Sequence, residues 1–194
     1  MSADARTAKK LATTRLRELG RLADLSAESL VDDIAAAAGL VQETLAGGGT
    51  LFFCGNGGSA ADAQHLATEY VVRYMKTRRA LPAIALTTDT SLLTAAANDL
   101  GFDQIFSRQV EALVRAGDLL VVHSTSGNSP NVLMAAQAAK AKGAKVLVLT
   151  ARDGGSLKVM ADVAVVIPTD RTDRAQELHL MIQHVICELV ESDA

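Results

Sequence analysis

The chain has 194 residues, of which 49% are apolar but only 3% are aromatic, and its formal net charge is −3. This length is sufficient for one domain with a sizeable core, and the composition predicts a core of aliphatic side chains. The slightly acidic charge gives no basis for expecting nucleic acid or an anionic membrane as a partner.

The N-terminal 21 residues are polar and charged, so they lack the apolar segment of a secretory signal peptide. No apolar run reaches the ~20 residues that a bilayer-spanning helix requires. The two cysteines, Cys54 and Cys187, lie in apolar segments far apart in the sequence, and we expect both to be buried thiols. We therefore predict a cytoplasmic protein with no membrane contact.

Residues 1–48 are expected to form two helices. The first covers residues 4–20 and ends near Gly20, and the second begins with Ser26 as its N-cap. Glycines that start at Gly47 end the second helix. A sheet alone cannot easily cover two helices that precede the first strand, so we expect this pair to pack on a partner subunit in an oligomer.

After these helices, short apolar runs alternate with helical stretches. The runs are continuously apolar, which indicates a sheet buried on both faces, and the alternation indicates parallel βαβ units. We predict an α/β fold for one domain over residues 1–194, with a five-stranded parallel sheet flanked by helices in residues 49–194. The expected strands are residues 50–54, 83–87, 119–123, 145–149 and 163–167. The expected helices are residues 59–76, 91–97, 104–115, 131–142, 155–160 and 173–191.

Two predicted strands are followed by loops rich in glycine or hydroxyl groups. The first loop is Gly55–Ser59 and the second is Ser124–Ser129, and each leads into a helix. Ligands of parallel sheets bind at the carboxyl ends of strands, and short donors at a helix N-terminus suit a phosphate. Neither loop has the lysine of a P-loop, and Ala60 replaces the third glycine of the dinucleotide fingerprint. The loops therefore favour a sugar phosphate.

The helix after the first loop carries His65 and Glu69, which project about 40° apart on one face. This pair can hold a metal ion or share a proton, although on spacing alone a surface pair is the commoner explanation. On the last helix, Gln176 and His184 lie ~12 Å apart, and His179 is closer to Gln176. Spacing alone does not predict a site there.

Two further polar segments have ordinary structural explanations. Asn98 and Asp99 read as a turn at a helix end, which could still fold back toward the strand ends. Lys76, Arg78 and Arg79 form a small basic cluster, which we interpret as a solvated helix end.

With these motifs in order, the chain resembles the phosphoheptose isomerases of the sugar isomerase (SIS) family from about residue 25 to residue 191. The resemblance implies a homotetramer with sites at subunit interfaces, where the last helix meets the first catalytic helix of a neighbouring chain. It also implies that D-sedoheptulose 7-phosphate is converted to D-glycero-D-manno-heptose 7-phosphate by enediol proton transfer, the first step of ADP- or GDP-heptose biosynthesis. The segments that carry the resemblance are Cys54–Ser59, Leu86–Asp89, Asn98-Asp99, Phe106–Val110, Ser124–Ser129, Asp153–Gly155, Gln176-Glu177, His179 and His184.

The resemblance also assigns roles to individual residues. Glu69 and His184 match the acid/base pair of the family. One Zn²⁺ per subunit is implied, with ligands matching His65, Glu69, Gln176 and His184. The residues implied in substrate binding are Asn56, Gly57, Gly58, Ser59, Glu69, Arg73, Asn98, Asp99, Ser124, Thr125, Ser126, Ser129 and Gln176. One departure is Ala60, where many members have a histidine.

Three other functions fit parts of the same pattern. The main one is a non-catalytic SIS protein that binds a replication initiator or a sugar phosphate. Members of that kind lack the glutamate and the last histidine, so the presence of Glu69 and His184 favours an enzyme. A sugar-phosphate-sensing regulatory domain and an isomerase of pentose or hexose phosphates are the other two.

Overall fold

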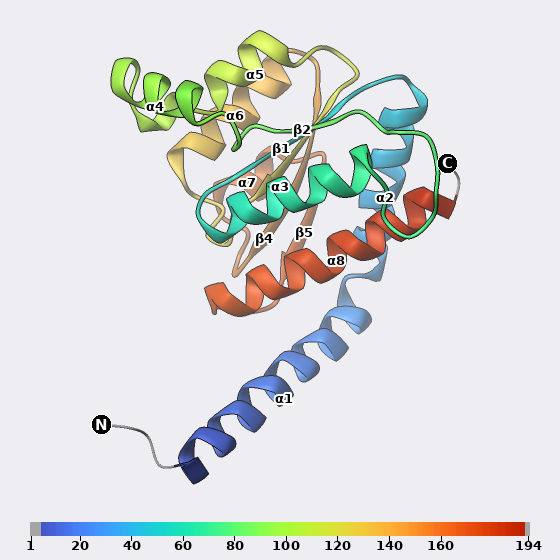
Figure 1. Cartoon of the computed structure of the whole chain (residues 1–194), viewed down its shortest axis with the longest axis vertical. Helices are drawn as coiled ribbons and strands as arrows, with labels where there is room; N and C mark the ends of the chain where they lie inside the picture. The colour runs from blue at the N-terminus through green and yellow to red at the C-terminus, as the bar shows by residue number, and fades with distance from the viewer. Residues whose placement is uncertain (1–4, 193–194) are drawn as a thin grey trace.

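The computed structural model of the chain describes residues 5–192 and contains a five-stranded parallel sheet in the order β2-β1-β3-β4-β5 (Figure 1). This confirms the predicted α/β fold, and each expected strand overlaps an observed one. The strands are β1 (Leu51–Gly55), β2 (Ala83–Ala85), β3 (Leu119–His123), β4 (Lys145–Ala151) and β5 (Val163–Ile167). The helices are α1 (Ala5–Ser29), α2 (Val31–Ala46), α3 (Gly58–Val71), α4 (Thr90–Asp99), the 3₁₀ turn η1 (Phe102–Gln104), α5 (Ser107–Leu113), α6 (Pro130–Ala141), α7 (Gly155–Met160) and α8 (Thr172–Ser192).

The central strands β1 and β3 are buried on both faces, as their continuously apolar sequences predict, whereas Ile84 on the edge strand β2 is exposed. Side chains alternate between the faces of a strand, so Phe53 and Val121 pack with α2, α3 and α8, whereas Phe52 and Val122 pack with α4 to α7. Cys54 and Cys187 are buried free thiols, which confirms that prediction. The sheet order therefore places α3 and α8 on the same face although more than 100 residues separate them.

The N-terminal helices differ from the expected boundaries. α1 continues through Gly20 and Ser26, and the break falls at Leu30. A glycine inside a helix costs about 1 kcal/mol relative to alanine, which does not end a helix by itself. Much of α1 projects away from the rest of the chain (Figure 1). Its exposed Leu11 and Leu16 are consistent with packing on a partner, but the role of these helices in an oligomer stays a prediction.

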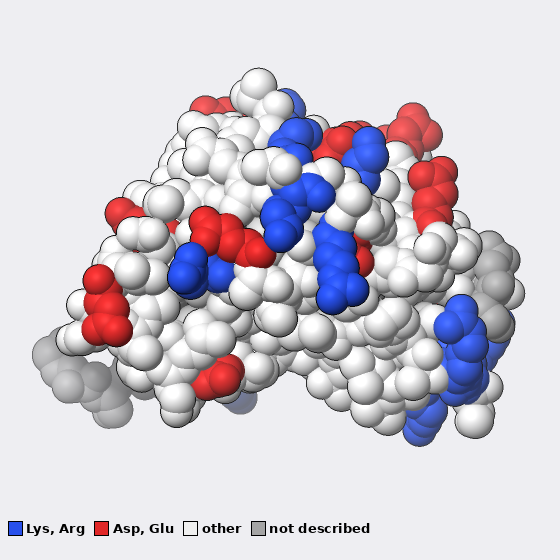
Figure 2. All heavy atoms as spheres, turned by 90° about the horizontal axis from the view of Figure 1, so that it is seen from above, with Lys and Arg blue, Asp and Glu red and all other residues white. Residues whose placement is uncertain are grey.

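The helix after the first loop is shorter than predicted. α3 ends at Val71 rather than near residue 76, because the next residues turn to bind the carboxylate of Glu191 on α8. Of the basic cluster in this segment, Lys76 and Arg79 are exposed, but the prediction of a solvated side chain is wrong for Arg78, which is only 6% exposed. On the face seen in Figure 2, basic and acidic side chains lie interspersed. No helix within residues 5–192 is both long and apolar enough to cross a bilayer.

Candidate active site

The two predicted phosphate loops meet at the carboxyl ends of β1 and β3 in a pocket of about 260 Å³. α3 starts at Gly58 and α6 at Pro130, so both helices direct their N-termini toward this end of the sheet. Free N–H groups and the helix dipole favour an anion at such ends. The residues that line the pocket are Asn56, Gly57, Gly58, Ser59, His123, Ser124, Thr125, Ser126, Ser129, Thr172 and Gln176.

Gln176 reaches this pocket from α8 because Gly58 leaves room for it. A Cβ atom on residue 58 would lie 2.6 Å from the side-chain amide of Gln176, closer than any stable contact. Gly57 before it has a φ of 59°, a conformation that favours glycine. The glycines of the first loop therefore give α8 close access to the start of α3.

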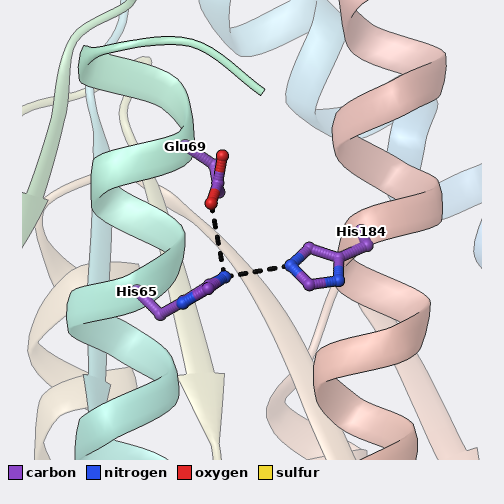
Figure 3. A group of neighbouring side chains, drawn as sticks. All are labelled: His65, Glu69 and His184. Atoms are coloured by element: carbon purple, nitrogen blue, oxygen red, sulfur yellow. Dashed lines mark hydrogen bonds and ion pairs between the residues drawn. The ribbon is translucent and has the colours of Figure 1, made fainter. Parts of the chain in front are cut away.

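Three ionisable side chains meet two turns further along the same pair of helices (Figure 3). Nε2 of His65 lies 3.0 Å from Nε2 of His184 and 3.3 Å from Oε1 of Glu69. Ligand atoms of all three lie within 4.8 Å of one another. α3 and α8 of a single chain build this cluster, so these three residues meet without a neighbouring chain. Sites at subunit interfaces stay a prediction.

The surroundings of His184 favour its neutral form. Partial burial lowers the pKa of His184, and His65 lowers it further, while the carboxylate of Glu69 opposes the shift. The ring of Tyr74 stacks on His184 with centroids 5.3 Å apart and an interplanar angle of 20°. A neutral imidazole held in this way can accept a proton or bind a metal ion.

The cluster of His65, Glu69 and His184 fits a zinc ion. Two imidazoles and a carboxylate form a common zinc ligand set that leaves a fourth position for another group. Ligand atoms around a tetrahedral zinc ion lie about 3.4 Å apart, given Zn–N distances of ~2.0–2.1 Å. The separations of 3.0 and 3.3 Å approach that value.

Other predicted residues lie outside both groups. Arg73 follows α3, is exposed, and donates from Nη1 to the carbonyl of Tyr74 at 3.2 Å. Asn98 and Asp99 lie at the exposed end of α4, where the amide of Asn98 donates to the carboxylate of Asp99 at 2.7 Å. Within one chain, therefore, the structure does not bring these three residues to the pocket.

A larger pocket, of about 360 Å³, lies near the amino ends of β1 and β3. Its only carboxylate within the described chain is Asp118, which accepts backbone N–H groups of Thr50 and Arg115 at 2.8 and 2.7 Å. This carboxylate joins two loops and is not free for chemistry. The polar groups suited to a reaction therefore lie at the carboxyl end of the sheet.

Comparison with known proteins gives the family. The SIS domain model matches residues 16–151. A phosphoheptose isomerase of Chlorobaculum parvum is 56% identical over 187 residues, covering 95% of this chain and 90% of that protein. The structure of a phosphoheptose isomerase from Neisseria gonorrhoeae is 45% identical with a TM-score of 0.90, covering 95% of this chain and 98% of that one. The structure of a phosphoheptose isomerase from Francisella tularensis is 35% identical with a TM-score of 0.92, covering 96% of this chain and 99% of that one. The chain belongs to the SIS family and, within it, to the phosphoheptose isomerases.

The chain also has two polar residues beside the pocket, Asn131 and His123, that the sequence analysis did not single out. Asn56 and Asn131 exchange two amide hydrogen bonds of 2.9 and 2.8 Å, which tie the first loop to α6. His123 lines the pocket from the end of β3 and lies 3.3 Å from the amide of Gln183. Asn131 belongs to an expected helix and His123 to an expected apolar strand, so the sequence patterns did not indicate that either residue lies at a functional site.

The two buried histidines, His123 and His179, predict that acid destabilises the fold. Burial lowers the pKa of His123 to about 3, with His179 adding to the shift, and burial lowers the pKa of His179 to about 4. Both ordinary values are 6.5, so the unfolded chain binds more protons than the folded one below that pH. We expect the free energy of unfolding to fall by about 1.4 kcal/mol per pH unit for each histidine as the pH drops from 6.5 toward 4.

Urea denaturation between pH 7 and pH 4.5 measures this dependence. His123→Gln keeps a polar side chain but removes the titrating group, so the loss of stability on acidification should become shallower. An unchanged slope in that variant would contradict the assignment to His123.

Proposed function

We propose that this chain converts D-sedoheptulose 7-phosphate into D-glycero-D-manno-heptose 7-phosphate, the first step toward a nucleotide-activated heptose. The observation that carries the proposal is that Glu69 and His184 meet on the same two helices, α3 and α8, whose first turns line the phosphate-type pocket. The names of the similar proteins support the same reaction.

The reaction moves a hydrogen between C1 and C2 of the sugar through an enediol. One group must take the proton bound to carbon, and another must exchange a proton with the neighbouring oxygen. Oε1 of Glu69 and Nε2 of His184 face the same space between α3 and α8 (Figure 3), so one substrate can contact both. A carboxylate and a neutral imidazole are suited to these two roles.

His65, Glu69 and His184 would hold the zinc ion, with Gln176 as the fourth ligand that the family resemblance implies. When bound, zinc supplies Lewis-acid stabilisation of negative charge on substrate oxygen atoms. Gln176 also lines the pocket, where its amide lies against Gly58.

The two loops would bind the phosphate at the far end of the substrate. Their hydroxyl and N–H groups, at the N-termini of α3 and α6, are suited to an anion. Binding energy from this remote group then positions C1 and C2 at the proton-transfer residues. We include Arg73, Asn98 and Asp99 among the substrate contacts only in an assembled oligomer, since they lie apart within one chain. The homotetramer and the cytoplasmic location stay predictions.

The alternative of a binding protein without catalysis is less well supported. Such a protein needs the phosphate loops but has no use for a carboxylate and two imidazoles gathered beside them. The full cluster of His65, Glu69 and His184 therefore favours the isomerase over a replication-initiator binder or a sugar-phosphate sensor.

Incubation with sedoheptulose 7-phosphate in D₂O, followed by NMR, tests the proposal. We expect the heptose 7-phosphate to form with deuterium at C2, because an enediol exchanges its proton with solvent. A chelator should slow the reaction and added Zn²⁺ should restore it. Ribulose 5-phosphate and fructose 6-phosphate in parallel samples report on substrate choice. Binding of sedoheptulose 7-phosphate without any conversion, with or without Zn²⁺, would contradict the enzyme assignment.

A further inference from the structure

The segment after α3 wraps around one carboxylate. The backbone N–H groups of Tyr74, Met75 and Lys76 donate to the side chain of Glu191 at 2.7, 2.8 and 2.8 Å. Glu191 lies in the last turns of α8, and its side chain is only 3% exposed. A single side chain of α8 therefore determines the path by which the polypeptide leaves α3.

Arg78 completes this arrangement from the other side. Its Nε atom lies 3.2 Å from Oε1 of Glu191, at ion-pair distance, and its Nη atoms are used elsewhere. Nη2 donates to the carbonyl of Glu69 at 2.6 Å, and Nη1 donates to the carbonyl of Tyr70 at 2.8 Å. The last carbonyls of a helix have no partner within it, so the guanidinium caps the end of α3 at the residue that bears the proposed catalytic carboxylate.

The same segment contacts the facing imidazole. Tyr74, whose N–H binds Glu191, stacks its ring on His184 at a centroid separation of 5.3 Å. Contacts from one short segment thus reach the backbone of Glu69 on α3 and the side chain of His184 on α8. We name Arg78, Glu191 and Tyr74 the α3–α8 clamp.

The chemistry of the clamp is better suited to fixing the positions of α3 and α8 than to adding stability. Burial would raise the pKa of Glu191, but the three N–H groups and the charge of Arg78 lower it overall, so the carboxylate stays ionised. A buried ion pair is weak evidence for stability, because desolvation offsets the attraction. Arginine is suited to this place since its planar fork binds several acceptors in fixed directions.

We propose that the α3–α8 clamp positions the active site, by holding Glu69 and His184 at the separation needed for metal binding and proton transfer. Arg78, Glu191 and Tyr74 are positioning residues, because each acts through Glu69 or His184. The catalytic part of this inference rests on the proposed isomerase function, whereas the metal-binding part does not.

The test compares variants of the clamp with variants that carry the same substitutions at an exposed ion pair. Glu191→Gln and Arg78→Lys alter the clamp, and Glu111→Gln and Arg108→Lys alter an ion pair whose side chains are 54% and 65% exposed. Co²⁺ is the probe, because its visible absorption reports both affinity and tetrahedral geometry. kcat and KM for sedoheptulose 7-phosphate are measured with saturating metal, well below each variant's melting temperature.

We expect the clamp variants to bind Co²⁺ about 10- to 100-fold more weakly, the usual effect of losing a group that orients metal ligands. kcat should fall by a similar factor while KM changes little, since the phosphate loops lie on other segments. The control variants should match the wild type. Folded clamp variants with unchanged Co²⁺ affinity and unchanged kcat would overturn the proposal.

A second pair of variants keeps the test decisive if the buried changes prevent folding. Tyr74→Phe preserves the stacked ring and should behave as wild type, whereas Tyr74→Leu should weaken Co²⁺ binding and lower kcat. Equal behaviour of the two would overturn the positioning role of the ring. If the clamp variants weaken Co²⁺ binding but the wild-type protein does not isomerise the sugar, only the proposed function is removed. Wild-type protein that neither binds Co²⁺ nor isomerises the sugar would overturn both.

Discussion

Replacing Glu69 with glutamine is expected to lower kcat by about 10²- to 10⁴-fold, the usual contribution of one proton-transfer group. Glutamine has nearly the same shape but cannot accept a proton from carbon. The carboxylate lies 3.3 Å from Nε2 of His65 in a side chain that is 19% exposed, so the substitution should leave the helix packing intact. Steady-state rates and deuterium incorporation at C2 measure both the conversion and the proton transfer behind it.

Glu43→Gln is the matched control for this variant. It makes the same change of charge on an exposed residue of α2, away from the pocket and the histidines. The control should retain full activity and the same melting temperature as the wild type. A Glu69→Gln enzyme with near-normal turnover would remove the carboxylate from the acid/base role.

His184→Ala is expected to abolish isomerisation to a comparable extent, because it removes both a proton carrier and a metal ligand. Two measurements separate these roles. A Co²⁺ titration reports the loss of the ligand, and turnover at saturating metal reports the loss of the proton carrier. Added imidazole should restore part of the turnover by entering the space that the side chain leaves.

Met181→Ala is a suitable control for truncation on α8, since Met181 lies in the same helix and is 43% exposed. It should leave activity and Co²⁺ affinity unchanged. Full turnover by His184→Ala would mean that another group carries out its proton transfer, and would separate this histidine from the chemistry.

Much of the fold could be predicted because it depends on local patterns. Continuously apolar runs indicated buried parallel strands, and the loops after β1 and β3 face one pocket because parallel strands end on the same edge. The end of α1 could not be predicted from Gly20. Helix propensity is a weak signal there, and the break instead falls at Leu30.

The candidate site was harder to predict than the fold. The ~12 Å between Gln176 and His184 along one helix argued against a shared site, but α3 and α8 run side by side. Gln176 therefore meets Gly58 while His184 meets His65. Arg78 looked like a surface cation because its partner, Glu191, lies 113 residues away. Contacts of this kind depend on tertiary packing and cannot be predicted from local sequence patterns.

The two contacts between α3 and α8, Gly58 with Gln176 and His65 with His184, also set a length scale. Gly58 and His65 are seven residues apart, which separates the anion end of the site from the imidazoles by ~10 Å along the helix. A sugar whose phosphate binds near Gly58 must be long enough for its reacting carbons to reach the imidazoles of His65 and His184. We therefore expect this spacing along α3 to favour a seven-carbon sugar phosphate over a five-carbon one.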